Sequence, residues 1–248
     1  MDAAHTIRQS LSRVTTLRAL ASSDPELERA LKAIKHFQAR RFAGTYRDLL
    51  ESDTFAAPTH FFLNELYGER DFSERDAQFA RIAGALQTFF PAQVVETATA
   101  LADLHALTES LDLEMARQYH SHQQRDERGL EELSPDQYVL AWRATSSQAV
   151  RQQQLNAVLQ VGAELTRLTH TRGLRMSLRL MRGPAKAAGL NALQYFLESG
   201  FDTFATMGKQ AAKQFLERIQ ERESMWVMTL FNAPAGQAAA QLSRCLGG

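Results

Sequence analysis

Residues 91–120, PAQVVETATALADLHALTESLDLEMARQYH, carry the clearest structural signal in the chain. After Pro91, apolar residues recur every three or four positions, which is the spacing of one face of an α-helix. The residues of this stripe are Val94, Ala98, Leu101, Leu104, Leu111 and Met115. We therefore predict a long amphipathic helix from Pro91 to about His120 that packs its stripe against other helices.

Helix start signals recur on both sides of this segment, whereas alternating Val/Ile/Thr-rich runs bounded by turn dipeptides are missing. Ser23-Asp24-Pro25 and Ser134-Pro135 each place a capping side chain before a proline, as at a helix N-terminus. We expect the second of these helices to reach about Thr171, and Ser73 to Asp76 to form a capping box. The prediction is an all-α fold, a bundle of roughly eight to ten helices without a sheet.

The domain organisation follows from length and composition. A chain of 248 residues with 44% apolar residues can bury one large core, and no Gly/Ser-rich linker divides it. We predict a single helical domain over residues 1–248, with a peripheral N-terminal helix at about 1–22 and a peripheral tail at 234–248. Gly200 and Gly208 are expected to interrupt the chain before a helix from Lys209 to about Phe231.

The charge balance limits the class of partner. Lys and Arg together number 28, as do Asp and Glu, so the overall basic bias of proteins that bind bulk nucleic acid is missing. No run of about 18 apolar residues predicts a transmembrane segment, and the N-terminus does not resemble a secretory signal. We expect a cytoplasmic protein.

A histidine and two carboxylates lie on or beside one face of the predicted helix 91–120. His105, Glu109 and Asp112 are one turn apart in succession, so they can converge on a ligand or a metal in the bundle interior. Carboxylate-bridged metal sites in bundles need Glu-x-x-His pairs from several helices, and this chain has none. The favoured interpretation is a hydrogen-bonded network between helices, with no metal and no cofactor.

A basic segment lies between Leu165 and Leu197, where the chain has no acidic residue. On one predicted amphipathic helix its cations fall within an arc of about 80° beside Leu174, Leu178 and Met181. These candidate anion- or partner-binding residues are Arg172, Arg175, Arg179, Arg182 and Lys186. They suit a phosphate-bearing ligand, an anionic lipid surface or an anionic protein. The alternative is a solvated face or internal ion pairs with the acidic segment Glu109–Asp136.

Residues 225–231, MWVMTLF, are apolar all around a helix. Such a segment is either deeply buried or covered by a second subunit, so a homodimer is one prediction. Dependence on a larger assembly is another.

Phe61-Phe62-Leu63-Asn64-Glu65-Leu66-Tyr67-Gly68 resembles the signature of an uncharacterised family of bacterial proteins named for an FFLEELY motif. Nearby strings, such as Arg41-Phe42 and Leu104-His105-Ala106-Leu107, are also similar to that family, over roughly Arg40 to Asp112. Asn64 departs from the acidic residue usual there. The resemblance implies a bacterial origin and no known activity. It draws attention to a shared polar site made of Tyr67, Arg75, Asp76, Gln78 and His105.

Two classes of function remain. The favoured one is a non-enzymatic helical binding or interaction protein whose basic face contacts an anionic partner. The alternative is a metal- or cofactor-dependent enzyme with a site at His105, Glu109 and Asp112. Walker loops, dinucleotide-binding glycine patterns and nucleophile elbows are missing from the sequence.

Overall fold

The computed structural model describes residues 2–66, 71–123 and 133–247, and all regular elements in these ranges are helices. The expected all-α bundle without a sheet is therefore confirmed for the described part of the chain. The α-helices are α1 (Ala3–Ser22), α2 (Pro25–Thr45), α3 (Arg47–Leu50), α4 (Ala56–Phe61), α5 (Ser73–Phe89), α6 (Ala92–Gln123), α7 (Pro135–Thr145), α8 (Gln148–Thr169), α9 (Leu174–Leu180), α10 (Arg182–Ala187), α11 (Asn191–Asn232) and α12 (Ala235–Leu246). A π-helical turn, η1 (Phe62–Leu66), follows α4.

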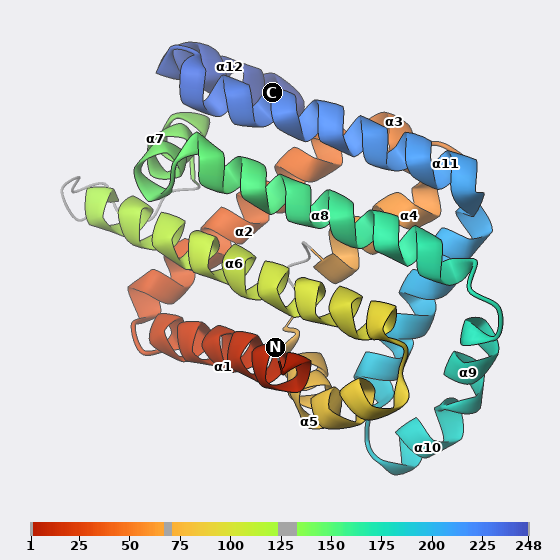
Figure 1. The fold of residues 1–248 in the computed structure, drawn as a ribbon. Coiled ribbons are helices and arrows are strands. Elements are labelled where there is room, and N and C mark those ends of the chain that lie inside the picture. Colours follow the sequence, from red (N-terminus) through yellow and green to blue (C-terminus); the bar gives the residue numbers. More distant parts are fainter. Residues whose placement is uncertain (1, 67–70, 124–132, 248) are drawn as a thin grey trace.

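The long helix predicted after Pro91 is α6, and it organises the bundle. It packs against α1, α2, α7 and α8, and α8 lies between α6 and α11 in Figure 1. Its buried residues belong to all three apolar clusters of the core. Val95 shares a cluster with residues of α1 and α5, Leu104 with residues of α4, α8 and α11, and Met115 with residues of α2, α7 and α12. The stripe read from the sequence is thus the central packing surface.

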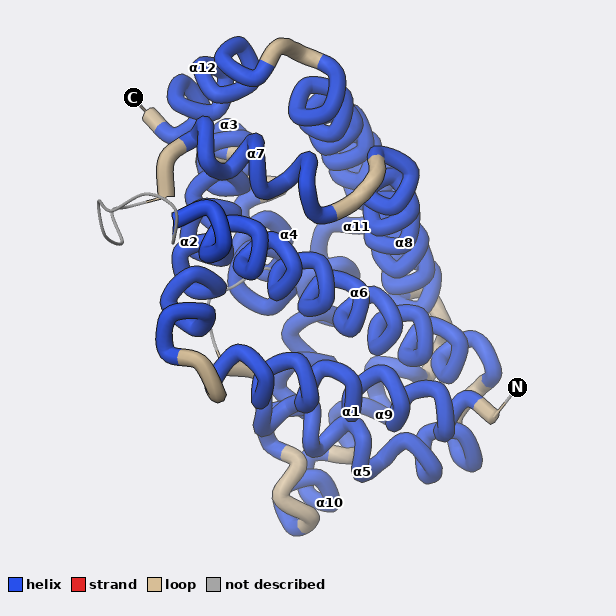
Figure 2. The backbone as a smooth tube through the Cα atoms, turned by 90° about the vertical axis from the view of Figure 1, so that its left-hand side faces the viewer, coloured by secondary structure: helices blue, strands red, loops and turns tan. Residues whose placement is uncertain are grey.

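Both terminal helices contribute to the core. Ile7 and Val14 of α1 are fully buried, and so are Ala238 and Leu242 of α12. Gly44 of α2 lets α12 approach, because a Cβ there would meet the backbone of Cys245. Figure 2 shows α12 and α7 at one end of the bundle and α10 at the other. Residues 3–22 and 235–246 thus pack against the other helices of the described bundle.

Two helix predictions were wrong at their boundaries. The helix expected from Pro135 to about Thr171 is divided into α7 and α8, because Ser146 and Ser147 are extended and Ser147 Oγ caps α8 at the N–H of Val150. The capping box expected at Ser73 is not formed. Asp71 instead accepts bonds from Ser73 N–H and Oγ, and Asp76 turns inward.

The caps at Asp24 and Ser134 are confirmed, the latter as a complete capping box with Gln137. Gly200 does not interrupt the chain, because α11 runs through it and the Phe61 ring packs where a Cβ would lie. Gly208, with φ of 76°, is the kink in α11, a conformation that glycine adopts without strain.

The basic segment also differs from the single helix expected. Gly173 (φ 82°) precedes α9, which ends at Leu180, and α10 starts at Arg182. Pro184 has no N–H to bond the carbonyl of Leu180, so the chain turns between the two short helices. Arg172 lies before α9 and is not part of the helical arc. None of the described helices combines the length and hydropathy needed to span a bilayer.

Candidate functional site

Four helices bring one group of charged side chains together inside the bundle. Arg18 comes from α1, Lys35 from α2, Arg75 and Asp76 from α5, and His105 and Glu109 from α6. We call these six residues the charged cluster. Asp76 and Glu109 are 5% exposed, so both carboxylates are inside the protein. Buried carboxylates must find cations or hydrogen-bond donors, and the surrounding helices supply them.

Asp76 is the centre of the charged cluster. Its carboxylate lies 2.9 Å from Arg18 Nη1, 2.9 Å from His105 Nε2 and 3.4 Å from Arg75 Nη2. Burial alone would raise the pKa of Asp76. The hydrogen bond from His105, with the charges of His105, Arg75 and Arg18, outweighs burial and lowers that pKa below its ordinary value. Asp76 is therefore a carboxylate at neutral pH.

Glu109 is held in the same way. Lys35 Nζ lies 2.9 Å from both of its oxygens, and Arg18 Nη2 lies 3.3 Å away. Burial opposes ionisation here too, but Lys35 and Arg18 lower the pKa of Glu109. Arg18 thus bridges the two carboxylates and joins α1 to α5 and α6.

His105 Nε2 faces the Asp76 carboxylate, so this nitrogen carries the proton and donates it. Arg18 Nη2 is 3.3 Å from the same nitrogen. Nδ1 is then the ring nitrogen that can exchange a proton with another group, as in an Asp–His pair that acts as a general base.

Arg75 ties the motif segment to the charged cluster. Its guanidinium lies 4.2 Å from the Phe72 ring and 4.6 Å from the Phe196 ring, and it donates to the carbonyl of Glu65 in η1 at 2.9 Å. Burial lowers the pKa of Arg75, although Asp76 opposes this. The π-helical turn of the motif is therefore held by the charged cluster, and such turns are frequent at functional sites.

The structure brings together four of the seven candidate site residues read from the sequence: Arg75, Asp76, His105 and Glu109. Gln78 has another role, because its Oε1 accepts the N–H of Leu193 at the start of α11 and its Nε2 donates to Glu74. Asp112 belongs to a second group, described next. Tyr67 lies outside the described residues. Arg18 and Lys35 were not predicted, since nothing in their spacing links them to α5 or α6.

A second polar group surrounds Asp112, deeper between α2, α6, α7, α8 and α11. It lines a cavity of about 50 Å³ with Arg41, Tyr138 and Arg151. Gln38 Nε2 donates to Asp112 at 3.1 Å, and burial raises the pKa of Asp112. Burial likewise raises the pKa of Tyr138 to about 12, so its phenol is neutral.

Arg41 is neutralised within this second group. Its Nη1 lies 2.7 and 2.8 Å from the two oxygens of Glu223, and Tyr46 Oη donates to the same carboxylate at 2.8 Å. Arg41 Nε, Tyr138 Oη and Trp142 Nε1 are buried without a hydrogen-bond partner among the described residues. This group fixes the deep core, and its cavity has room for only about three to five waters.

An apolar cavity lies on the other side of the charged cluster, with a volume of about 280 Å³. Side chains of α4, α5, α6, α8, α9, α10 and α11 line it, and nearly all are apolar. Two polar residues on its wall have their donors occupied: Thr97 Oγ1 bonds to Gln93 O, and Gln194 Nε2 bonds to Leu178 O and Glu198. No sequence pattern indicated this cavity, because residues from many separate helices form its wall.

The apolar cavity adjoins the charged cluster. A cavity of about 50 Å³ contacts Arg75, Asp76 and His105, and four apolar residues line both spaces. They are Phe79, Leu101, Leu193 and Phe196. These four side chains form a shared wall between the apolar cavity and the smaller space at the Asp76–His105 pair.

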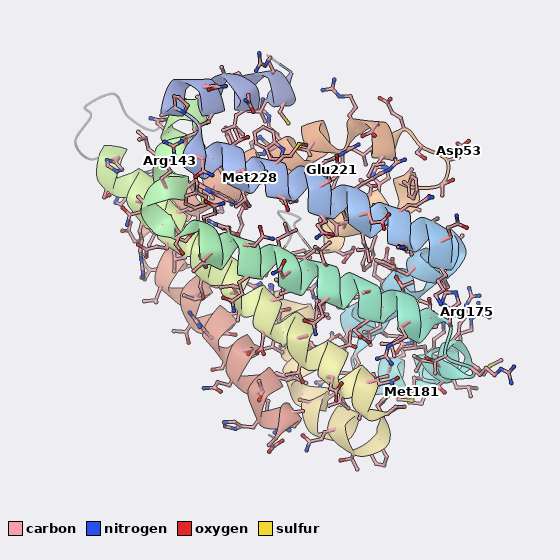
Figure 3. The ribbon with its side chains drawn as sticks, turned by 45° about the horizontal axis from the view of Figure 1, so that its top comes forward. Asp53, Arg143, Arg175, Met181, Glu221 and Met228 are labelled. Atoms are coloured by element: carbon pink, nitrogen blue, oxygen red, sulfur yellow. The ribbon has the colours of Figure 1, made fainter. Side chains whose placement is uncertain are left out.

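The two short helices α9 and α10 lie at the edge of the bundle in Figure 1, and both contribute to the wall of the apolar cavity. Their residues Leu174, Leu178, Met181 and Ala185 line its wall. Figure 3 places Arg175 and Met181 at this outer edge. The short helices thus separate an apolar interior from a basic exterior, as the sequence pattern indicates.

The five cations predicted as a binding face divide into two sets. Arg175 pairs with Asp202 at 2.8 Å, and Arg182 Nε lies 2.7 Å from Glu198, so both are tied to α11. The side chains of Arg172, Arg179 and Lys186 are exposed and make no hydrogen bond or ion pair with any described residue. Part of the segment is thus bridged internally, to α11 and not to Glu109–Asp136.

No three His, Cys, Asp or Glu side chains in residues 2–66, 71–123 and 133–247 lie close enough together to hold a metal ion. Asp76 and Glu109 are each paired with cations. Of the three residues named for a metal- or cofactor-dependent site, His105 and Glu109 lie in the charged cluster, and Asp112 accepts a hydrogen bond from Gln38.

Comparison with protein families assigns the chain to a family without a known function. Residues 17–237 match the family described as Domain of unknown function (DUF8198), so the chain belongs to that family. No curated protein and no solved structure matches the chain.

Proposed function

We propose that this member of the DUF8198 family is a non-enzymatic binding protein for a small amphipathic anion. The apolar part of that molecule occupies the cavity beneath α9 and α10, and its anionic group lies toward the cations of those helices. The single observation that carries the proposal is the apolar cavity of about 280 Å³.

An exposed apolar wall is unfavourable in a folded protein, because its side chains meet water and do not pack against other atoms. The side chains that line this space are apolar except for Thr97 and Gln194. An apolar occupant would remove this wall from water, which supports a bound molecule.

The wall of the cavity defines the chemistry of the occupant. Because Thr97 and Gln194 already use their donors, the buried part of the ligand gains nothing from polar groups. A cavity of about 150 Å³ holds benzene, so on the same scale this one accommodates about eleven carbon atoms. A medium-length alkyl chain or a two-ring aromatic group fits this description.

The cations on α9 and α10 argue for an anionic group at the other end of the ligand. The side chains of Arg172, Arg179 and Lys186 form no ion pair among the described residues, although the charge of Arg179 helps to lower the pKa of Glu198, and α9 and α10 also form the cavity wall. A carboxylate or phosphate at the cavity edge would meet a positive potential.

The test is a chain-length series of alkyl carboxylates, measured by isothermal titration calorimetry. Each methylene buried contributes ~0.8 kcal/mol, so the Kd should fall about fourfold per carbon from hexanoate to decanoate. The series should level off beyond about eleven carbons, when the cavity is full. Decanol should bind more weakly than decanoate. Chain-length-independent binding, or no binding of decanoate, would overturn the proposal.

A second candidate function is an enzyme in which His105 acts as a general base on the bound molecule. The observation in its favour is that the Asp76–His105 pair adjoins the apolar cavity. Hydrolysis of p-nitrophenyl octanoate that exceeds that of p-nitrophenyl acetate, and is lost in His105→Asn, would support it. A bacterial origin, a cytoplasmic location and a homodimer through residues 225–231 remain predictions from the sequence.

A further inference from the structure

The helix α9 has apolar side chains on two nearly opposite faces. Leu174 and Leu178 line the apolar cavity, whereas Met176 and Leu180 do not. Because successive residues of a helix are 100° apart, the second pair is rotated by about 200° from the first. Met176 is 59% exposed and Leu180 is 70% exposed. The apolar side chains on the inner face line the cavity, whereas those on the outer face are exposed and contribute nothing to the cavity wall.

Cations surround this outer face. Arg172, Arg179 and Lys186 are exposed and have no ion-pair partner among the described residues, and residues 165–197 include no acid. The nearest acids on α11, Glu198 and Asp202, are already paired with Arg182 and Arg175. The surface thus combines long aliphatic side chains with fixed positive charge.

We propose that the outer face of α9, with the free cations beside it, docks onto the surface of an anionic lipid bilayer. Met176 and Leu180 would enter the boundary between headgroups and acyl chains, while the cations contact lipid phosphates. Charge complementarity favours an anionic surface, and two neighbouring aliphatic side chains suit a fluid apolar phase.

This inference rests on the proposed function in one respect. If the ligand carries an alkyl chain, docking of α9 on a bilayer lets that chain pass between the membrane and the apolar cavity without crossing water. Met181, which lines the cavity and is 41% exposed, lies at the edge between the two (Figure 3). Docking itself requires only the outer face and its charges.

The experiment is co-sedimentation of the full chain with phosphatidylcholine vesicles, with and without phosphatidylglycerol. The wild type should bind the anionic vesicles, bind the neutral ones weakly, and dissociate in high salt. Met176→Ser/Leu180→Ser should weaken the partition coefficient at least ~10-fold. Arg172→Gln/Arg179→Gln/Lys186→Gln should weaken it on the order of 100-fold.

Leu20→Ser/Leu140→Ser is the matched control, because these leucines of α1 and α7 are 45% and 52% exposed and lie outside the basic segment. This variant should bind like the wild type. Equal losses in the two double variants, or no wild-type binding to anionic vesicles, would overturn the proposal. Circular dichroism reports folding of each variant.

Calorimetry with decanoate on Met176→Ser/Leu180→Ser separates the two proposals. This variant retains Leu174 and Leu178, so its affinity for decanoate should stay unchanged while vesicle binding is lost. Decanoate binding without any vesicle binding overturns docking alone. Vesicle binding without decanoate binding overturns the proposed ligand and leaves docking in place.

Discussion

Filling the apolar cavity from within should separate its role in ligand binding from its role in folding. Ala98 of α6 is half-buried and lines the cavity. Ala98→Leu adds three carbon atoms, which the space of about 280 Å³ can accept without moving the helices. The exposed Ala92, near the start of the same helix, does not line the cavity, so Ala92→Leu is the matched control.

The magnitude follows from the three added carbons. At ~0.8 kcal/mol each, they should raise the free energy of unfolding of the ligand-free protein by about 2 kcal/mol. For a chain of this length that is a rise in Tm of roughly 4–8 °C. The same carbons remove room for about three carbons of the ligand, so decanoate should bind on the order of 50-fold more weakly. Hexanoate should be little affected, because it needs only about half of the original space.

Urea unfolding, thermal unfolding and calorimetry with the two carboxylates measure these effects. Ala92→Leu should change neither stability nor affinity. The reasoning is refuted if Ala98→Leu weakens hexanoate and decanoate equally, or if decanoate binding is unchanged in a more stable Ala98→Leu protein. The second result would place the binding site elsewhere.

Three further predictions concern the buried charges. Arg18→Met should destabilise the protein by about 3 kcal/mol in urea unfolding near neutral pH, because it removes the cation between Asp76 and Glu109, whereas exposed Arg13→Met should not. The lowered pKa of each carboxyl stabilises the fold above the unfolded-state pKa, and this is lost as pH falls through the folded-state pKa, so the Arg18→Met deficit should shrink in acid. Glu223→Gln should cost about 3 kcal/mol, since it leaves buried Arg41 without its counter-charge, and exposed Glu221→Gln, labelled in Figure 3, should cost little; equal effects would contradict the ion-pair argument. Because burial raises the pKa of Asp112, Asp112→Asn should stabilise the protein most above that folded-state pKa and not below about pH 4; a gain that is independent of pH would show that ionisation is not the cause.

Periodicity and capping were enough to predict the helical fold. The apolar stripe from Val94 to Met115 predicts α6, because the side chains that a helix buries recur at a spacing that can be read from one continuous segment of the sequence. The π-helical turn at residues 62–66 was not predictable in the same way. Its bonding depends on Arg75, which reaches back to Glu65 from another helix.

The charged cluster was predicted only in part, and the reason is physical. His105 and Glu109 share a helix face, and Arg75 and Asp76 came from the motif resemblance. Arg18 and Lys35 approach from α1 and α2, and their roles depend on how four helices pack. Local spacing carries no information about such long-range contacts.

The basic segment was likewise predicted in part. Its cations and its apolar face were visible in the sequence, and the cavity wall at Leu174 and Leu178 agrees with that pattern. The pairing of Arg175 and Arg182 with α11, and the turn before Pro184, depend on tertiary structure. Side chains from seven helices line the cavity itself, so no single segment could indicate it.

The most direct measurement is a crystal structure of the protein soaked with 10-bromodecanoate, with anomalous scattering to locate the bromine. The proposed function predicts a bromine peak inside the apolar cavity, among Leu101, Phe196 and Phe201. A peak only on the protein surface, or an unoccupied cavity at saturating ligand, would contradict it.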